Sequence, residues 1–389
     1  MKKTLIAATG IAAVALGTAI VLSQGGGDID LNGLTPNDTS FKDPIEVSQS
    51  EALTIVSLNI RDMAGRDRTL EDFQELARLM EGADILVLQE MGAKAFKTTS
   101  SNDDMMARLV ASTEVIKSYL GVEWEFIFAD GPTPEALGGA AEIPCMGYRK
   151  SHGEVTISAD WSGYFDLGTR RDRGTFTVTC SKGASKEVFT IGSVHTKPDC
   201  AERTEELLKI ADYIEEHEDD NYILLGDFNW GYKSTCSVKF QGEDRLTELH
   251  DDGSVFQVFH TISYTREGTE DDFKTNLDLR KTTKMYDQFF VCKNYADQLA
   301  NGGSLGEDCG FVSFSMNKYF QSRMDDIVRE QINGVKAYMR TQGYKSSDPE
   351  TKAAVAATEA EILTSNITVT KASHKMSDHK PIWMRINLF

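Results

Sequence analysis

The chain has 389 residues, of which 40% are hydrophobic and 26% are charged, and its formal net charge at pH 7 is −19. This composition is that of a folded globular protein and excludes a mostly disordered chain. The acidic charge argues against a protein whose affinity comes mainly from a broad basic surface. It still allows a phosphate-ester substrate, because metal ions can lie between acidic side chains and a phosphate.

The chain begins with an apolar segment. Lys2 and Lys3 precede a run from Thr4 to Leu22 that contains no charged residue. We interpret residues 1–27 as a signal peptide or an N-terminal membrane anchor, and both readings stay open because no small-x-small cleavage site is obvious. Either reading predicts export, with the protein periplasmic, secreted or anchored, and an uncleaved segment would contact the membrane. Residues 28–50 are typical of a flexible linker.

From Leu53 onward the chain alternates between short apolar runs and amphipathic stretches. The apolar runs predict buried strands, and apolar residues at helical spacing predict helices that cover them. In chain order, the expected strands are LTIVSLNI, DILVLQE, WEFIFAD, IPCMGYRK, GTFTVTC, EVFTIGSVH, YILLGDFN, MYDQFFVC and HKPIWMRINLF. The expected helices are TLEDFQELARLM, residues 105–120 and AERTEELLKIADYIEEH. This order indicates stacked sheets flanked by helices.

A late segment, about residues 311–366, departs from this pattern. It contains the helical stretches MNKYFQSRMDDIVREQINGVKAYMRTQ and PETKAAVAATEAEILTSN. We interpret it as a helical insertion between the last two strands of one domain that spans residues 51–389. The insertion could be a lid, a substrate-selecting element, a partner surface or a packing accessory.

The sequence contains six cysteines, all of which follow the apolar leader: Cys145, Cys180, Cys200, Cys236, Cys292 and Cys309. Export and an even count favour disulfide bonds, although the count alone cannot assign the pairing. The alternative is that some of these thiols are free and buried. Because no two of them form a C-x-x-C pair, we do not expect a cysteine-based zinc site.

Polar residues recur where the expected strands end. A single such residue is usually a turn or cap residue, but turn chemistry does not explain so many strand ends in one chain. The residues concerned are Asn59, Glu90, His195, Asp227, Asn229, Asp287, Asp378 and His379. Carboxylate and amide oxygens are the ligands that Mg²⁺ and Ca²⁺ prefer, and histidines can act as general acids or bases. The set suits hydrolysis at phosphorus, and no P-loop motif is present to indicate nucleotide-driven chemistry.

The ordered series SLNI, VLQE, EIPCMGYRK, SVHTKPD, GDFN, YDQ and SDHKP resembles the endonuclease/exonuclease/phosphatase superfamily, which includes deoxyribonuclease I. GDFN and the terminal SDH are its most specific pieces. The resemblance covers roughly residues 53–389, apart from the late insertion. It implies an α/β (α+β) fold: a four-layer α/β/β/α sandwich of two mainly antiparallel sheets with outer helices.

The resemblance also implies roles for individual residues. Metal ligands would be Glu90, Asn59 and Asp378. Catalytic groups would be His195, Asp227, Asn229 and His379, with Glu142 pairing with His195 and Asp287 with His379. The substrate would be contacted by Tyr148, Arg149, Arg171 and Arg173, although Tyr148 and Arg149 could equally be structural and the sequence does not choose between Arg171 and Arg173. The implied cofactor is Mg²⁺, with Ca²⁺ or Mn²⁺ as alternatives.

These expectations describe an exported, metal-dependent phosphodiesterase, most simply a nuclease that cuts DNA or RNA by in-line attack of water. One alternative is a sphingomyelinase-like lipid phosphodiesterase, which would need exposed apolar loops. Another is a phosphatase of inositol phosphates or other small esters, for which we find no convincing Lys/Arg cluster. A non-catalytic binding relative is disfavoured because the core motif residues are all present. The sequence predicts no protein partner.

Overall fold

A computed structural model describes residues 52–61, 63, 68–92, 102–129, 143–164, 174–229, 241–259, 286–299, 308–311, 329, 332–364 and 379–389. By its internal contacts the chain divides into two units. One comprises Met1–Thr35 with Ser315–His374, and the other comprises Pro36–Phe314 with Lys375–Phe389. The expected leader and linker lie outside the described residues. Within the described residues, every helix is too short or too polar to span a bilayer.

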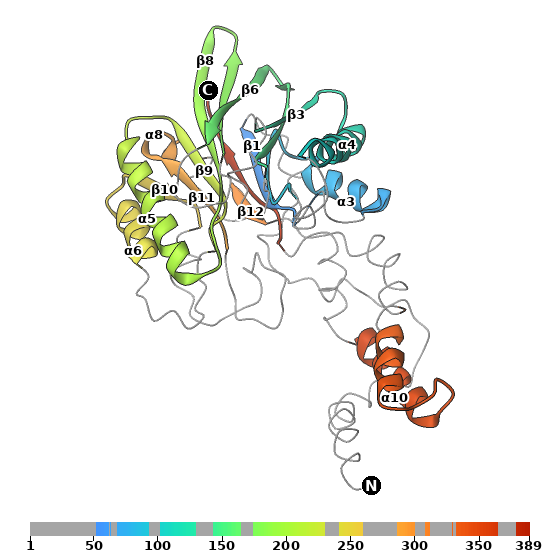
Figure 1. Cartoon of the computed structure of the whole chain (residues 1–389). Helices are drawn as coiled ribbons and strands as arrows, with labels where there is room; N and C mark the ends of the chain where they lie inside the picture. Colours follow the sequence, from blue (N-terminus) through green and yellow to red (C-terminus); the bar gives the residue numbers. More distant parts are fainter. Residues whose placement is uncertain are drawn as a thin grey trace. The chain divides into compact units, whose positions relative to one another are not determined.

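The larger unit contains two sheets (Figure 1). The first has the order β12 (Cys309–Phe311), β13 (Ile382–Ile386), β1 (Leu53–Asn59), β2 (Ile85–Gln89), β4 (Cys145–Arg149) and β3 (Trp124–Phe128). All neighbouring strands in it are antiparallel except β1 and β2. The central pair β1 and β2 therefore ends at one common edge of the sheet.

The second sheet has the order β10 (Val255–Gln257), β11 (Asp287–Cys292), β9 (Tyr222–Asp227), β8 (Ser185–His195), β7 (Gly174–Lys182), β6 (Val155–Tyr164) and β5 (Ser151–His152). Here too all neighbours are antiparallel except one pair, β8 and β9. Each sheet thus has one parallel pair at its centre, and such pairs need a crossover connection. Helices supply both crossovers, α3 between β1 and β2 and α5 between β8 and β9.

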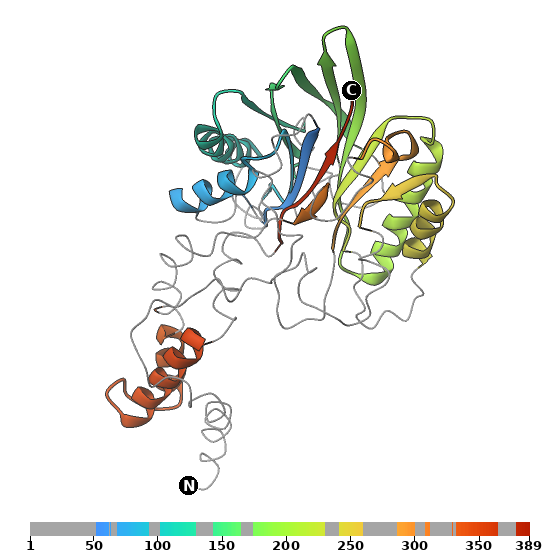
Figure 2. The ribbon, with the colours of Figure 1, turned by 180° about the vertical axis from the view of Figure 1, so that it is seen from behind.

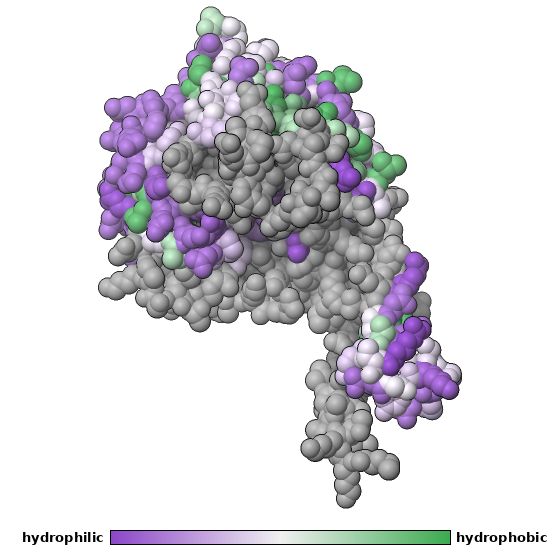
Figure 3. Space-filling view, in the orientation of Figure 1, coloured by the Kyte–Doolittle hydropathy of each residue, from purple (hydrophilic) through white to green (hydrophobic). Residues whose placement is uncertain are grey.

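Helices cover the outer faces of both sheets, as Figures 1 and 2 show. The first sheet carries α3 (Leu70–Met80) and α4 (Asn102–Leu120), and the second carries α5 (Cys200–Glu216), α6 (Gln241–Asp251) and the short α8 (Lys293–Ala296). The outward faces of α5 and α6 are largely hydrophilic (Figure 3). The expected four-layer sandwich of mainly antiparallel sheets is confirmed.

Local sequence explains where the crossover helices begin. Thr69 caps α3 in a capping box, in which its side chain accepts from the Asp72 N–H while the Asp72 carboxylate accepts from the Thr69 N–H. Asp199 caps α5 by accepting from the N–H groups of Ala201 and Glu202. These caps satisfy N–H groups that the first helical turn leaves without partners.

The core lies between the two sheets, and strand alternation builds it. β1 and β2 are buried along their whole length because one face meets the other sheet and the opposite face meets helices. Side chains such as Ile55, Val87 and Ile191 belong to one continuous hydrophobic cluster. The centre of the sandwich is therefore mainly apolar.

Some elements were not predicted from the sequence. Strand β6 has the alternating buried and exposed pattern of an antiparallel strand, with Val155, Ile157 and Ala159 on the buried face. Its many polar residues hide it from a search for continuous apolar runs. The short strands β10 and β12 and the helix α6 were also missed.

Three of the cysteines, Cys145, Cys180 and Cys292, are buried free thiols. Burial raises the pKa of Cys180 to about 12 and also raises the pKa of Cys145. The expected disulfide bonds therefore do not involve these three residues, and the alternative of free buried thiols holds for them. Cys309 is also buried, while Cys236 and the side chain of Cys200 lie outside the described residues.

The described part of the other unit is helical, as expected for the late insertion. Residues 332–341 form a helix, and α10 (Pro349–Thr364) follows after a turn. Asp348 stabilises this turn, since its Oδ2 accepts from the Lys345 N–H at 2.8 Å.

Candidate active site

Polar side chains converge where the two parallel strand pairs end. Asn59 is the last residue of β1, and Glu90 directly follows β2. In the other sheet the register pairs His195, the last residue of β8, with Asp227, the last residue of β9. Crevices at the carboxyl ends of parallel strands are common ligand sites in α/β proteins.

Two further residues reach the same place from antiparallel strands. Asp287 is the first residue of β11 and is paired with Asp227 in the sheet. His379 precedes β13, whose first residue Ile382 is paired with Ser57 near the end of β1. An antiparallel partner starts where its neighbour ends, so both side chains lie beside the ends of the parallel strands.

The backbone at this edge has an uncommon conformation. In the described part of the chain, the non-glycine residues with positive φ are Arg61 (53°), Glu90 (55°) and Asn229 (47°). Each lies within two residues of the end of β1, β2 or β9. Such strained residues concentrate at functional sites, where the surrounding structure holds them.

Asp227 is at the centre of the cluster. Its Oδ2 accepts a hydrogen bond from Asn59 Nδ2 at 3.1 Å and lies 3.5 Å from Nε2 of both His195 and His379. Its Oδ1 accepts from the backbone N–H of Asn229 at 2.9 Å. One carboxylate therefore connects four of the residues that the motifs singled out.

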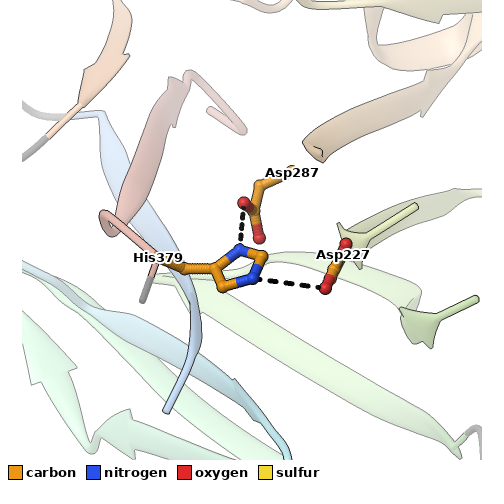
Figure 4. A group of neighbouring side chains, drawn as sticks. All are labelled: Asp227, Asp287 and His379. Carbon is orange, nitrogen blue, oxygen red and sulfur yellow. Dashed lines mark hydrogen bonds and ion pairs between the residues drawn. The ribbon is translucent and has the colours of Figure 1, made fainter. Parts of the chain in front are cut away.

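Asp287 orients His379 (Figure 4). Nδ1 of His379 lies 2.8 Å from Oδ2 of Asp287, and the other ring nitrogen faces Asp227. A carboxylate in this position fixes the ring and favours a proton on Nδ1. The expected pairing of Asp287 with His379 is seen in the structure.

Burial controls the electrostatics of the cluster. It raises the pKa of Asp227 above its usual range, an effect that His379 and His195 oppose and Asp287 strengthens. Both histidines are 5% exposed. An ionised carboxylate in such a place is costly unless a positive charge lies close to it.

The donor set fits a divalent cation. Ligand atoms of Asp227, Asp287 and His379 all lie within 4.8 Å of one another, and all three residues are buried. Glu90 adds a further carboxylate, with Oε1 3.2 Å from Asn59 Nδ2 and 3.7 Å from His195 Nε2. Several carboxylates converging in a buried place are what a hard cation requires and would also offset their mutual repulsion.

Asn59 and Asn229 both donate hydrogen bonds that hold the site together. Asn59 directs its amide nitrogen to Glu90 and Asp227, and its oxygen accepts from the Arg61 N–H at 3.0 Å. It therefore holds the two carboxylates together, and its expected role as a metal ligand stays a prediction. Asn229 donates through Nδ2 to the carbonyl of Thr196 at 2.8 Å, which ties the ends of β8 and β9 together.

The structure does not bring Tyr148 and Arg149 to this cluster. Antiparallel pairing places Tyr148 beside Ile85, the first residue of β2, and so at the opposite end of the strand from Glu90. The Tyr148 hydroxyl donates to Glu125, and the Arg149 guanidinium donates to the Glu81 carbonyl. Both are structural, which is the alternative that the sequence left open, and a substrate contact at this site is not supported.

Four expected site residues lie outside the described residues: Glu142, Asp378, Arg171 and Arg173. Two buried residues near the site were missed, Gln89 and Ser193. Strand periodicity could have indicated them, because Gln89 shares the parity of the core residue Val87, and Ser193 that of Ile191.

Comparisons with known proteins show similarity at the level of structure. No family model matches the chain, and no curated protein matches it in sequence. Zebrafish (D. rerio) TDP2 complexed with a single-strand DNA product is 13% identical, with a TM-score of 0.44, and the match covers 87% of this chain and 100% of that one. An endonuclease/exonuclease/phosphatase family protein from Bacteroides thetaiotaomicron is 16% identical, with a TM-score of 0.38, over 63% and 84% of the two chains. The human Nocturnin catalytic domain is 12% identical, with a TM-score of 0.37, over the same shares.

The two sheets, the outer helices and the gathering of the motif residues at the strand ends are what the sequence resemblance implied. At these identities the similarity indicates nothing about substrate.

Proposed function

We propose that this protein is a divalent-metal-dependent phosphodiesterase that cleaves nucleic acid, with DNA as the first candidate substrate. The observation that carries the proposal is the buried Asp227 carboxylate, which faces two histidines and the amide that holds Glu90. A set of acidic oxygens with two imidazoles suits in-line hydrolysis at phosphorus and lacks the nucleophile of an acyl-transfer site.

Glu90 is the residue that we assign as the main metal ligand. The tightest group of possible ligands is Asp227 with Asp287 and His379, but the last two are already bonded to each other at 2.8 Å. The Glu90 carboxylate lies beside this group, because Asn59 Nδ2 donates both to Glu90 Oε1 at 3.2 Å and to Asp227 Oδ2 at 3.1 Å. When bound, the metal supplies charge neutralisation of the phosphate and stabilisation of the leaving oxygen. Mg²⁺ is the first choice, with Ca²⁺ or Mn²⁺ as alternatives, and Asp378 would complete the site.

Asp227 is suited to orient the attacking water and accept its proton. Burial raises its pKa, which makes its ionised form a stronger base than an exposed aspartate. The N–H of Asn229 holds one of its oxygens, so the carboxylate has a fixed direction. The other oxygen faces the ring nitrogens of the two histidines.

The histidines are suited to bind the phosphate and protonate the leaving oxygen. The bond to Asp287 leaves Nε2 of His379 directed into the cluster. Nε2 of His195 is directed to the same carboxylate from the opposite sheet. As imidazolium ions both can donate to phosphoryl oxygens, and neutralising one negative charge there favours attack.

We also propose that the chain is exported, on the basis of Lys2, Lys3 and the uncharged run from Thr4 to Leu22. The acidic net charge is compatible with a phosphate substrate only if the cation contributes to binding. TDP2, which has been seen with a single-strand DNA product, sets DNA as the substrate to try first and does not identify it.

The test is incubation of the purified protein with plasmid DNA and, separately, RNA, in Mg²⁺, in Ca²⁺ and in EDTA, with His379→Ala as control. Metal-dependent cleavage that is lost in the variant supports the proposal. Hydrolysis of a simple phosphodiester without cleavage of either polymer would contradict the nucleic-acid part. Sphingomyelin and inositol phosphates would then be the substrates to examine.

A further inference from the structure

Inward-facing side chains of the sandwich change in character toward the active site. On β1 and β2, Ile55 and Val87 belong to the hydrophobic core. Two positions further along, the same faces carry Ser57 and Gln89, because strand residues two apart share a face. On β8, Ser193 occupies the equivalent position. A buried polar layer therefore lies between the apolar core and the catalytic residues.

Gln89 joins this layer across the two sheets. Its Nε2 donates to Oγ of Ser57 at 3.2 Å on the neighbouring strand. The same nitrogen donates to Oγ of Ser193 at 3.5 Å on the opposite sheet. Gln89 is 4% exposed, and both serines are buried as well. The amide is thus a direct polar link between the sheets, one residue before Glu90 of the catalytic cluster.

Hydrogen bonds also hold the main chain of Gln89 and Glu90 in place. Its carbonyl oxygen accepts from the Ile60 N–H at 3.1 Å, and the carbonyl oxygen of Glu90 accepts from the Met63 N–H at 3.1 Å. Glu90 directly follows Gln89 and has a φ of 55°. Because the two residues share a peptide unit, movement of the Gln89 main chain would also move the Glu90 carboxylate.

Stability alone does not favour an amide at this position. Burying a long polar side chain removes its hydration and its rotamer freedom, and hydrogen bonds offset this loss only in part. Methionine has a similar length and would fill the same volume with apolar atoms. What distinguishes Gln89 is its reach from Ser57 to Ser193, which lie two residues before Asn59 and His195 respectively.

We propose that Gln89 is a positioning residue that holds Glu90, on one sheet, in register with His195, on the other. The inference rests on the proposed function, in which Glu90 binds the metal and His195 contacts the phosphate. The two side chains are 3.7 Å apart, between His195 Nε2 and Glu90 Oε1. A misplacement of about 1 Å at a reacting centre can lower turnover on the order of a hundredfold.

The first experiment compares Gln89→Met, Ser193→Ala and the double variant in Mg²⁺-dependent hydrolysis of bis(p-nitrophenyl) phosphate by the full chain. We expect Gln89→Met to lower kcat about tenfold or more while KM stays within about twofold, because positioning rather than ground-state binding is lost. The double variant should be no slower than Gln89→Met, since both substitutions break the same link.

Gln257→Met is the matched control. Gln257 is also a buried glutamine whose Nε2 donates to another side chain, that of Gln288 at 3.1 Å, but it takes no part in the catalytic cluster. The Gln257→Met substitution should change the melting temperature about as much as Gln89→Met does, and it should leave kcat unchanged. Equal losses of kcat in the two variants, or an unchanged kcat in Gln89→Met, would overturn the positioning role.

A second measurement separates this inference from the proposed function. If the wild type hydrolyses no phosphodiester, the proposed function is wrong, but the ¹H–¹⁵N signals of the His195 ring still report its surroundings. Gln89→Met should then shift those signals and leave the ring of His217, which stacks on Tyr213 at the end of α5, unchanged. Unshifted His195 signals would exclude the link even in an inactive protein.

Discussion

His379 and Asp287 are 92 residues apart in the sequence, yet Nδ1 of His379 lies 2.8 Å from Oδ2 of Asp287. The pair spans the two sheets, because Asp287 begins β11 of one and His379 precedes β13 of the other. It fixes which ring nitrogen faces Asp227. The chemistry proposed for His379 therefore depends on correct assembly of the whole sandwich.

The first prediction concerns this pair. His379→Ala should lower kcat on the order of a hundredfold or more, the usual contribution of a general acid or base. Asp287→Asn should lower kcat in the same direction, because an amide no longer selects the proton on Nδ1. Steady-state kinetics with a simple phosphodiester measures both effects. Turnover close to wild type in both variants, with unchanged melting temperatures, would contradict the assigned roles.

The second prediction concerns Asn59, whose amide nitrogen lies 3.2 Å from Glu90 and 3.1 Å from Asp227. Asn59→Asp has nearly the same shape but places a third carboxylate between two others. We expect it to lower the melting temperature in EDTA and to recover most of the loss in Mg²⁺, because a cation offsets the repulsion. Asn59→Ala is the control, since it removes the amide without adding charge. A loss in Asn59→Asp that Mg²⁺ leaves unchanged would argue against a cation beside these carboxylates.

The third prediction concerns Gly226, in the strand that carries Asp227. Its φ is 133°, and a Cβ atom there would lie 2.0 Å from the carbonyl oxygen of Val194 on β8. Gly226→Ala should therefore destabilise the fold by at least about 3 kcal/mol, since backbone must move. Gly253→Ala is matched in positive φ (83°) but meets no atom within 4 Å. It should cost about 1–2 kcal/mol, from conformation alone. Equal costs in denaturant titrations would show that the close approach of β8 and β9 is unimportant.

The fourth prediction concerns pH and Glu243, at the start of α6. Burial raises the pKa of this carboxyl to about 7, although Arg203 nearby opposes the shift. A carboxyl with a raised pKa binds its proton more tightly in the folded state, so the free energy of unfolding falls as pH rises toward 7. Glu243→Gln should remove this dependence, so that wild type loses about 3 kcal/mol relative to the variant between pH 4.5 and 8. A pH-independent difference between the two unfolding free energies would contradict the raised pKa.

Strand ends were the most informative part of the sequence. Asn59, Glu90, His195 and Asp227 could be singled out because polar residues directly follow or end continuous apolar runs. Such runs specify buried strands, and the helices between them indicate stacked sheets flanked by helices. The four-layer sandwich itself and the roles of these residues were implied by the resemblance of the motifs to a known family, and the structure confirms the sandwich.

Other features depend on contacts between distant segments. Tyr148 was misplaced because the motif gave its strand but not the direction of that strand beside β2, and direction decides which end reaches the site. The orientation of the Asn59 amide depends on two carboxylates from different sheets and so has no local signal. β6 was missed because polar residues alternate with its inward-facing residues, of which Trp161 is one. The strand therefore contains no continuous apolar run.

Hydrolysis of bis(p-nitrophenyl) phosphate by the wild type and by Asp227→Asn, each in Mg²⁺ and in EDTA, tests the central claim most directly. This substrate needs no nucleic-acid, lipid or inositol recognition, so it examines the cluster itself. Asp227→Asn keeps the shape of the side chain and removes its charge and basicity. We predict metal-dependent turnover in the wild type that is abolished by EDTA and reduced on the order of a hundredfold or more by the substitution. Turnover that persists in EDTA, or that Asp227→Asn leaves unchanged, would contradict a metal-dependent phosphodiesterase centred on Asp227.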